Sequence, residues 1–482
     1  MGEQDANAMT HLETLFLRAA TAILEQIAAG MKPEDIPVIP YPQTIFQSAS
    51  SWTRQIVGYK NYQQVADRYK DHFLQLETVQ ACAATHHAAG VLELSPPVDP
   101  SSTLTPAQLN QLGEYLWYPL MDTLQRYDTL KPTQEQLLES YRRFREAWTA
   151  TTVRQNAIIP LLNFRAEGLT LPIGISSHYE LAPLSLEEKT AFWSRVDAFQ
   201  GWDLLPFRSF LAAEFRLQGS RTHPRMHQNA TEQMIAEFSR SHIEMLYEVR
   251  NIVTALRLLH PGDVAVTAYI EESNEVPPFG GNPSMGIPGA GLSDFQVRRH
   301  GFLSPYTLQD ADVPLVRSLV EKLHQLDTRE HRGGVEIALS RFNQSYVRDS
   351  LEDRLIDLTI ALESCLLAGL DSKTELKYRF TLRGTALLAQ QSQPQEVSRK
   401  LSALYDARSA IVHSGQYLSQ QKSKQLLNQQ PAAFVQTCED LTRTLVRAYI
   451  EALTQAGGQG TIIDINKTLE QRILRGLGNA HQ

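Results

Sequence analysis

An arginine and a histidine, Arg408 and His413, lie five residues apart near the end of the sequence, in the stretch LYDARSAIVHSG. Arginine is well suited to binding phosphate groups, and histidine can transfer protons near neutral pH. Together they could form a two-residue active site for cutting RNA. The same spacing is also expected by chance in a chain of 482 residues, so the surrounding sequence must decide.

Helix geometry limits how these two residues can act together. Successive residues of an α-helix are about 100° apart, so Arg408 and His413 would point about 140° away from each other on a straight helix. Either the end of the helix bends, or a second copy of the chain completes the site. Gly415 is the expected helix stop, which places His413 in the last turn, where the helix dipole favours a protonated ring. Ser409, one turn earlier, could bond to that ring.

Two other pairs in the chain have a comparable spacing, Arg216 with His223 and Arg221 with His227. Both lie in RLQGSRTHPRMHQ, which contains Pro224 and no apolar stripe. We expect a loop there, so the context of these pairs does not favour a site.

Charged residues interrupt the apolar stripes of three consecutive C-terminal helices, expected over residues 351–370, 373–390 and 396–413. Glu363 lies among aliphatic residues, Arg383 fills a gap in the second stripe, and Arg408 continues the third. Burying an unpaired charge is costly, so each needs a partner. One interpretation is an ion pair between Glu363 and Arg383 that fixes the helix register. The other is that one or both shape a phosphate site.

Taken together, these segments resemble the C-terminal domain of HEPN proteins, specifically the Apea-like branch. The resemblance covers residues 346 to about 460, and NAIIPLLNF and ALRLLHPGDV more loosely resemble the middle region that often precedes this domain. Its landmarks are IALE, LRGTALL and YDARSAIVHSG, which contain Glu363, Arg383, Tyr405, Asp406, Arg408 and His413.

The resemblance implies an all-helical, bundle-like domain that dimerises, with the two Arg/His motifs meeting near the two-fold axis. Family members with this motif are frequently metal-independent RNA endonucleases, often in antiphage or toxin systems. By this analogy Arg408 would bind the scissile phosphate, and His413 would be the general acid/base for attack by the 2′-hydroxyl. Supporting positions would be Ser409, Glu363, Arg383, Tyr405 and Asp406. Many active members carry an amide or acidic residue where this chain has Ser409.

Three functions are therefore open. The first is a dimeric ribonuclease that cuts tRNA or another structured RNA without metal or cofactor, restrained by residues 1–345 until a trigger or partner protein arrives. The second is a non-catalytic HEPN module for dimerisation or nucleotide binding. The third is a scaffold whose acidic N-terminal helices recruit a partner protein.

Other histidine clusters favour structural roles. His223 and His227 have the spacing of metal ligands on a helix, but the proline between them opposes a helix and no third ligand is evident. His86 and His87 are adjacent and would diverge on a helix, so a metal site with Cys82 is only a weak alternative.

Three further segments contain residues that could take part in chemistry. The stretch GGNPSMGIPGAG lacks the GK[ST] ending of a phosphate-binding loop, and Ser176, Ser177 and His178 do not form a nucleophile elbow. The helix segment SYRRFREAW could contact RNA, but a solvated face with core aromatics is the better interpretation.

The elements that must position these residues indicate an α+β multidomain protein that is mainly α. Residues 1–150 are expected to be helical, with proline-rich breaks at 32–42 and 95–106. Residues 151–330 form a mixed domain in which strands surround a long helix at 232–259, and 274–294 form an exposed loop. Residues 331–482 are the Apea-like HEPN helical domain, with helices that include 420–427 and 432–456.

Composition excludes several classes of protein. Three separated cysteines argue against a disulfide framework or a zinc finger. The net charge of -8 argues against a protein coated for nonspecific binding to nucleic acids, although residues 346–482 contain 16 Lys and Arg against 14 Asp and Glu. No apolar run approaches the roughly 20 residues of a membrane span, and the N-terminus has no targeting pattern. We therefore expect a cytoplasmic protein without membrane contact.

Overall fold

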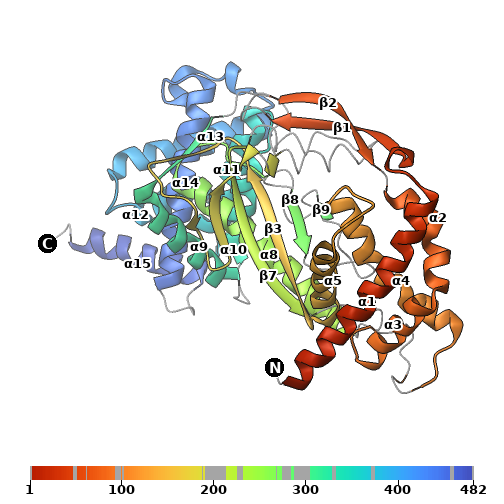
Figure 1. The fold of residues 1–482 in the computed structure, drawn as a ribbon. Helices are drawn as coiled ribbons and strands as arrows, with labels where there is room; N and C mark the ends of the chain where they lie inside the picture. The colour runs from red at the N-terminus through yellow and green to blue at the C-terminus, as the bar shows by residue number, and fades with distance from the viewer. Residues whose placement is uncertain are drawn as a thin grey trace.

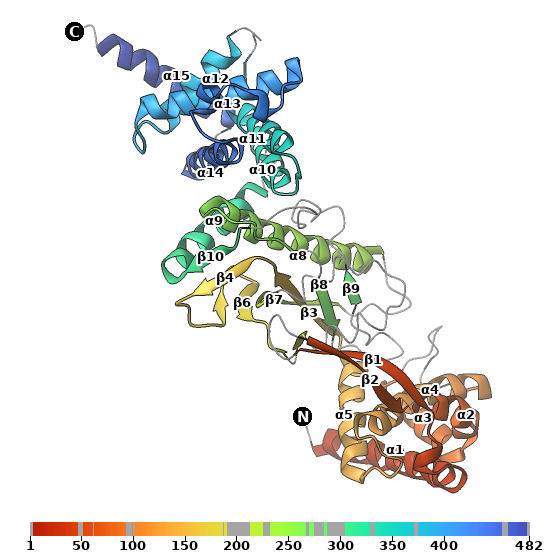
Figure 2. The same cartoon turned by 90° about the horizontal axis from the view of Figure 1, so that it is seen from above.

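The computed structural model describes residues 3–46, 52–60, 62–92, 99, 102–186, 188–189, 213–224, 232–266, 269–273, 284–286, 304–327, 333–370, 375–455 and 461–479. The chain is mainly helical with a small sheet region, which confirms the fold class at this level. Figures 1 and 2 show the N-terminal helices at one end, a sheet in the middle and the last helices at the other end. Within the described ranges, no helix combines the length and the apolarity needed to cross a membrane.

The N-terminal helices surround a hydrophobic cluster of their own, which extends from Phe16 to Trp148. They are α1 (Glu3–Gly30), α2 (Tyr62–Gln75), α3 (Glu77–Ala88), α4 (Pro106–Arg126) and α5 (Gln134–Thr149). Helix α4 begins as expected, because the side chain of Thr105 accepts a hydrogen bond from the Gln108 N–H and Pro106 occupies the first turn.

A hairpin interrupts these helices where only a proline-rich break was expected. Its strands are β1 (Val38–Phe46) and β2 (Trp52–Lys60), antiparallel from Val38 opposite Lys60 to Phe46 opposite Trp52. The expectation of an irregular break was wrong because proline is compatible with a strand that has an unpaired edge, where its missing N–H costs no ladder bond. A two-stranded hairpin offers such an edge on each strand.

The middle of the chain forms a six-stranded antiparallel sheet with the order β5-β6-β7-β3-β8-β9. Its strands are β3 (Thr152–Leu161), β5 (Ile173–Gly174), β6 (Tyr179–Pro183), β7 (Phe215–Pro224), β8 (Tyr269–Ser273) and β9 (Ser284–Gly286). Helix α8 (Glu232–Leu259) lies over this sheet (Figure 2) and has the bounds that the sequence predicts. A separate parallel pair joins β4 (Phe164–Glu167) to β10 (Tyr306–Gln309).

The loop expected around Arg221 is a strand instead, and the loop expected at 274–294 contains a short strand. The segment that contains Arg216 and Arg221 is β7, which pairs with β3 along its whole length. Its polar residues belong to one of the longest ladders in the sheet, where cross-strand pairing overrides the turn signals. Within the expected loop at 274–294, β9 pairs with β8, and the rest of that loop lies outside the described residues.

The C-terminal helices pack around α11 (Leu351–Leu366), which contacts α10, α12, α13 and α14. The others are α9 (Val313–Asp327), α10 (Gly333–Ser345), α12 (Leu376–Leu387), α13 (Pro394–Ser414), α14 (Pro431–Gln455) and α15 (Ile462–Asn479). The helix expected at 420–427 was wrong. Two 3-10 turns, η4 (Leu418–Gln420) and η5 (Ser423–Leu426), stand there, and the φ of 56° at Leu427 is incompatible with continuing a helix.

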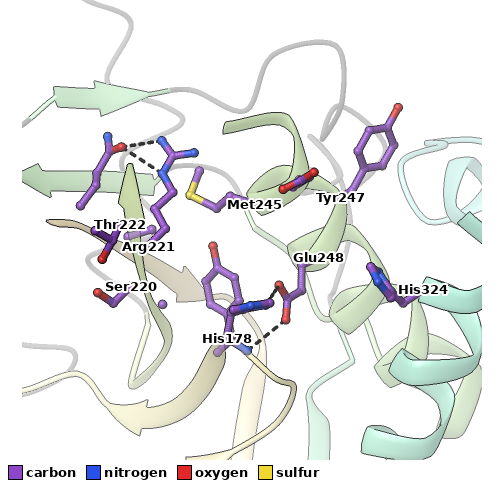
Figure 3. A pocket seen from close by; sticks show the side chains of 13 residues that line it. His178, Ser220, Arg221, Thr222, Met245, Tyr247, Glu248 and His324 are labelled. Carbon is purple, nitrogen blue, oxygen red and sulfur yellow. Dashed lines mark hydrogen bonds and ion pairs between the residues drawn. The ribbon is translucent and has the colours of Figure 1, made fainter. Parts of the chain in front are cut away.

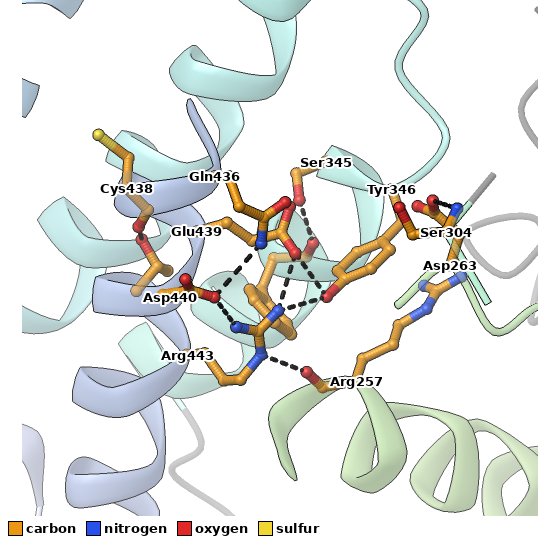
Figure 4. A network of polar contacts seen from close by, with 12 residues as sticks. Arg257, Asp263, Ser304, Ser345, Tyr346, Gln436, Cys438, Glu439, Asp440 and Arg443 are labelled. Atoms are coloured by element: carbon orange, nitrogen blue, oxygen red, sulfur yellow. Dashed lines mark hydrogen bonds and ion pairs between the residues drawn. The ribbon is translucent and has the colours of Figure 1, made fainter. Parts of the chain in front are cut away.

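The middle and C-terminal elements share one hydrophobic cluster, and a buried polar network crosses it (Figure 4). At its centre Glu439 of α14 accepts hydrogen bonds from Arg443 (2.8 Å), Tyr346 (3.0 Å) and Arg354 (2.6 Å). Arg443 also donates to the carbonyl oxygen of Arg257 in α8 at 2.7 Å. The Arg257 guanidinium lies 4.4 Å from the centre of the Tyr346 ring. Helix α8 is thereby tied to α14.

Candidate functional site around Glu363 and Arg408

Helix α13 carries both residues of the Arg/His pair, and its end is defined as expected. Gly415 follows the helix with a φ of 62°, a left-handed conformation that glycine adopts without steric cost, and its N–H bonds back to the carbonyl of Ile411. His413 therefore lies in the last turn, where it is exposed. Arg408, on the opposite part of the helix surface, is half-buried.

The partner of Arg408 is Glu363 of α11. Arg408 Nη2 lies 3.5 Å from the Oε2 atom of Glu363, and the two side chains are 22% and 20% exposed. This separation is long for a charge-assisted hydrogen bond, which usually measures about 2.7–2.9 Å. Burial raises the pKa of Glu363, and the positive charge of Arg408 lowers it only in part.

The guanidinium of Arg408 keeps unused bonding capacity. Its Nε atom is buried and finds no hydrogen-bond partner among the residues that the structure describes. A buried N–H without an acceptor costs about 1–3 kcal/mol, and an acceptor that bound there would remove this cost. An anion bound at this position could accept from that N–H.

The predicted ion pair between Glu363 and Arg383 was wrong. Arg383 is buried and donates through Nε and Nη2 to Glu470 of α15, at 3.0 and 2.6 Å. Its Nη1 donates to the carbonyl oxygens of Leu366 and Ala368, at 2.7 and 3.3 Å. These carbonyls lie at the end of α11, where the helix leaves acceptors without internal donors. Arg383 therefore fixes helix ends, and within the described chain it forms no hydrogen bond or ion pair with Glu363 or Arg408.

Of the remaining supporting residues, Tyr405 is influenced by the Glu363–Arg408 pair, whereas Asp406 forms a separate contact on the surface. The pKa of Tyr405 is raised by burial and by the charge of Glu363, so this phenol belongs to the same electrostatic environment. Asp406 pairs with Lys377 at 2.6 Å on the surface, where such a bridge contributes little. Ser409 makes no hydrogen bond to His413 in the part of the chain that the structure describes, so the expected bond to the ring is not formed.

The N-terminal histidines have structural roles rather than the geometry of a metal site. His86 is buried, and its Nδ1 lies 2.6 Å from the carbonyl oxygen of Cys82. A carbonyl only accepts, so Nδ1 carries the proton and Nε2 accepts from the Tyr141 hydroxyl at 2.6 Å. His87 turns away and bonds through Nδ1 to the carbonyl of Leu92 at 2.9 Å. Both Nδ1 atoms thus bond to backbone carbonyls, whereas the buried Nε2 of His87 has no hydrogen-bond partner among the described residues.

Acid is expected to destabilise the N-terminal helices through His86. Burial lowers the pKa of His86 from an ordinary 6.5 to about 4, so between these values the unfolded chain binds a proton that the folded chain does not. Stability should be complete above pH 6.5 and should fall by about 3 kcal/mol as the pH is lowered to 4. Urea unfolding of the full chain at a series of pH values, followed by Trp fluorescence, measures this fall.

His86→Gln should reduce this acid sensitivity whatever its effect at neutral pH, whereas His72→Gln, at an exposed site in α2, should leave it unchanged. An unaltered pH dependence in His86→Gln would contradict the assignment.

The basic helix segment of α5 is a structural surface. Arg142 donates to both carboxylate oxygens of Glu13, at 2.9 and 3.0 Å, and Arg143 donates to Asp122 at 2.6 Å. The aromatic residues of the same helix, Tyr141, Phe144 and Trp148, are buried. The interpretation as a helix face with core aromatics is confirmed.

Within the described residues, no group of three or more His, Cys, Asp and Glu side chains is arranged to hold a metal ion. His223 belongs to strand β7 rather than to a helix, and His227 lies outside the described residues. Comparisons with protein-family models, with curated proteins and with solved structures give no match to this chain.

Sequence reasoning missed two features of this region. It identified Glu363 and Arg408 separately but did not pair them, although both interrupt apolar stripes. Glu470 was not predicted as a partner, because it lies in α15, beyond the segments that carry the resemblance. The sequence shows Glu470 only as a carboxylate on an amphipathic C-terminal helix. Such a pattern does not indicate which residue the carboxylate pairs with.

Proposed function

We propose that this protein is a metal-independent RNA endonuclease of the HEPN type, in which Arg408 and His413 carry the reaction. The observation that carries the proposal is Arg408 itself, a half-buried arginine with a loose pair to Glu363 and an unpartnered Nε. A phosphate group would accept from these donors. The bundle of α10 to α14 around α11 fits the all-helical domain that the resemblance implies.

The reaction needs only groups that this chain and its RNA substrate provide. The 2′-hydroxyl of the RNA attacks the neighbouring phosphorus, a bond from the 2′-oxygen to phosphorus forms, and the bond from phosphorus to the 5′-oxygen breaks. His413 takes the proton from the 2′-hydroxyl, and an imidazolium returns a proton to the 5′-oxygen. Arg408 stabilises the charge that develops on the phosphate. The products are a 2′,3′-cyclic phosphate and a 5′-hydroxyl.

A second copy of the chain supplies the geometry that one helix lacks. In a two-fold dimer each α13 faces its counterpart, so Arg408 of one copy can approach His413 of the other. The surface next to His413 is apolar enough for such a contact, since Val412 is 48% and Tyr417 62% exposed. Residues 1–345 would restrain the activity until a trigger arrives, as defence or toxin proteins require.

The direct test is to incubate the purified protein with total RNA in EDTA, alone and with candidate triggers. We expect cleavage with cyclic phosphate ends in the wild type and cleavage at least about 10²-fold slower in His413→Ala. If the wild type forms a dimer but cleaves no RNA under any condition, the non-catalytic alternative, a dimerisation or nucleotide-binding module, replaces this proposal. Cleavage at the wild-type rate in His413→Ala would remove the assigned role of the histidine.

A further inference from the structure

A cavity of about 570 Å³ lies between the middle sheet and α8 (Figure 3). Small residues on the sheet create the space, because Ala157 of β3 and Gly219 of β7 stand opposite each other in the strand register. The Tyr179 ring covers Gly219 so closely that a Cβ there would come within 2.5 Å of it. Pockets that bind small molecules measure about 300–1,000 Å³, so this cavity has the size of a ligand site.

One wall of the cavity presents a fixed cation. Arg221 of β7 stands opposite Gln155 of β3, and its Nε and Nη2 donate to the Gln155 Oε1 at 2.9 and 2.5 Å. This contact holds the planar guanidinium against the sheet at the edge of the cavity. A guanidinium fixed in this way recognises a carboxylate or a phosphate.

The other wall presents carboxylates. Glu248 of α8 accepts hydrogen bonds from the Ser176 hydroxyl at 2.5 Å, the His178 backbone N–H at 3.3 Å and the His178 Nδ1 at 2.8 Å. These donors fix its orientation, and Glu244, one turn earlier in α8, adds a second carboxylate to the lining. Figure 3 shows His178 and Glu248 facing each other across from Arg221.

The same geometry excludes hydrolysis by a serine nucleophile at this site. The Ser177 hydroxyl lies 3.0 Å from Nδ1 of His178, the nitrogen that also contacts Glu248. A Ser-His-acid triad requires the hydroxyl and the carboxylate on opposite ring nitrogens. Ser177, His178 and Glu248 therefore do not form such a triad.

We propose that this cavity binds a small zwitterionic molecule of amino-acid or dipeptide size. Its carboxylate would bind Arg221, and its ammonium group would bind between Glu244 and Glu248. Ala157, Tyr179 and Met245 form the apolar lining that would surround the rest of the molecule. Two charged ends of opposite sign, separated by an apolar middle, match this class and disfavour a simple anion. The binding is independent of RNA cleavage.

The test is calorimetric titration of the full chain with the twenty common amino acids and a panel of dipeptides, each up to about 1 mM. We expect at least one to bind saturably. Arg221→Gln, which keeps a donor for Gln155, should weaken that binding by at least about tenfold. Ala157→Leu, which fills the cavity, should abolish it while the unfolding temperature stays at or above that of the wild type.

The matched control is Arg154→Gln. Arg154 lies on the adjacent strand and donates to the Ser220 hydroxyl at 2.8 Å, but it does not line the cavity. Binding should be unchanged in this variant. The proposal is overturned if no zwitterion binds saturably, if Arg221→Gln and Arg154→Gln behave alike, or if acetate and phosphate bind as tightly as the best zwitterion.

Discussion

Arg408→Ala and His413→Ala are each expected to lower the rate of RNA cleavage by about 10²–10⁴-fold, with no change in folding. Mixing the two variants should then restore part of the activity. Neither substitution should prevent folding, because His413 is exposed and the half-buried Arg408 forms only a loose pair. The loss therefore reports on chemistry, and circular dichroism and unfolding temperature should match those of the wild type.

The restoration follows from the dimer geometry. If each site takes Arg408 from one copy and His413 from the other, a mixed dimer has one intact site and one site that lacks both groups. After free exchange of subunits half of the dimers are mixed, so about a quarter of the wild-type sites are intact. The measurement is the initial rate of cleavage of one labelled RNA before and after the two variants are mixed.

Arg399→Ala is the control for this experiment. Arg399 is an exposed arginine of the same helix, α13, and its removal should leave cleavage unchanged. A mixture no more active than its separate components would contradict a site shared between two copies, because each active site would then lie within one chain.

Periodicity in the sequence predicted the long elements well. The apolar pattern over 232–259 set both ends of α8, and Gly415 marked the end of α13, because a helix of several turns and a glycine stop leave strong local signals. The hairpin β1–β2 was missed for the opposite reason. Strand β1 contains Pro40 and Pro42, which indicate a break when only the local sequence is considered. The segment is a strand because it pairs with β2, and local sequence does not reveal that pairing.

Side-chain partners were harder to predict than elements. Periodicity placed Glu363 and Arg383 among apolar residues but could not show where each pointed. In the structure Arg383 turns to Glu470, 87 residues later in the chain, and Glu363 faces α13. The cavity was missed for the same reason, because Glu248 and His178 are 70 residues apart and meet only through the packing of α8 on the sheet.

Helix α8 connects this cavity with the C-terminal helices. Glu248 lies at the cavity and Arg257 at the joint with α14, nine residues later and so about 14 Å along the helix axis. The stability of the contact between α8 and α14 therefore decides whether the middle sheet and the C-terminal helices keep a fixed relative position.

Glu439→Ala is expected to lower the free energy of unfolding of the shared middle and C-terminal core by about 3–5 kcal/mol. Glu439 is buried and is the common acceptor for Arg443 and Arg354. In the alanine variant both guanidinium groups remain in the low-dielectric interior but lose the carboxylate that they share. Removing one member of a buried ion network is costly because it leaves buried charge uncompensated. Urea unfolding measured by circular dichroism gives the change from the shift in midpoint at constant slope.

Asp440→Ala is the matched control, because Asp440 is the next residue of α14 and pairs with the same Arg443. Its side chain is 54% exposed, so water replaces the lost interaction and the expected cost is at most about 1 kcal/mol. Both variants remove a carboxylate that pairs with Arg443, so the difference between their losses in free energy of unfolding reports the effect of burial. If both variants lose the same stability, the network at the joint is a surface feature, and α8 is not held to α14 by buried charge.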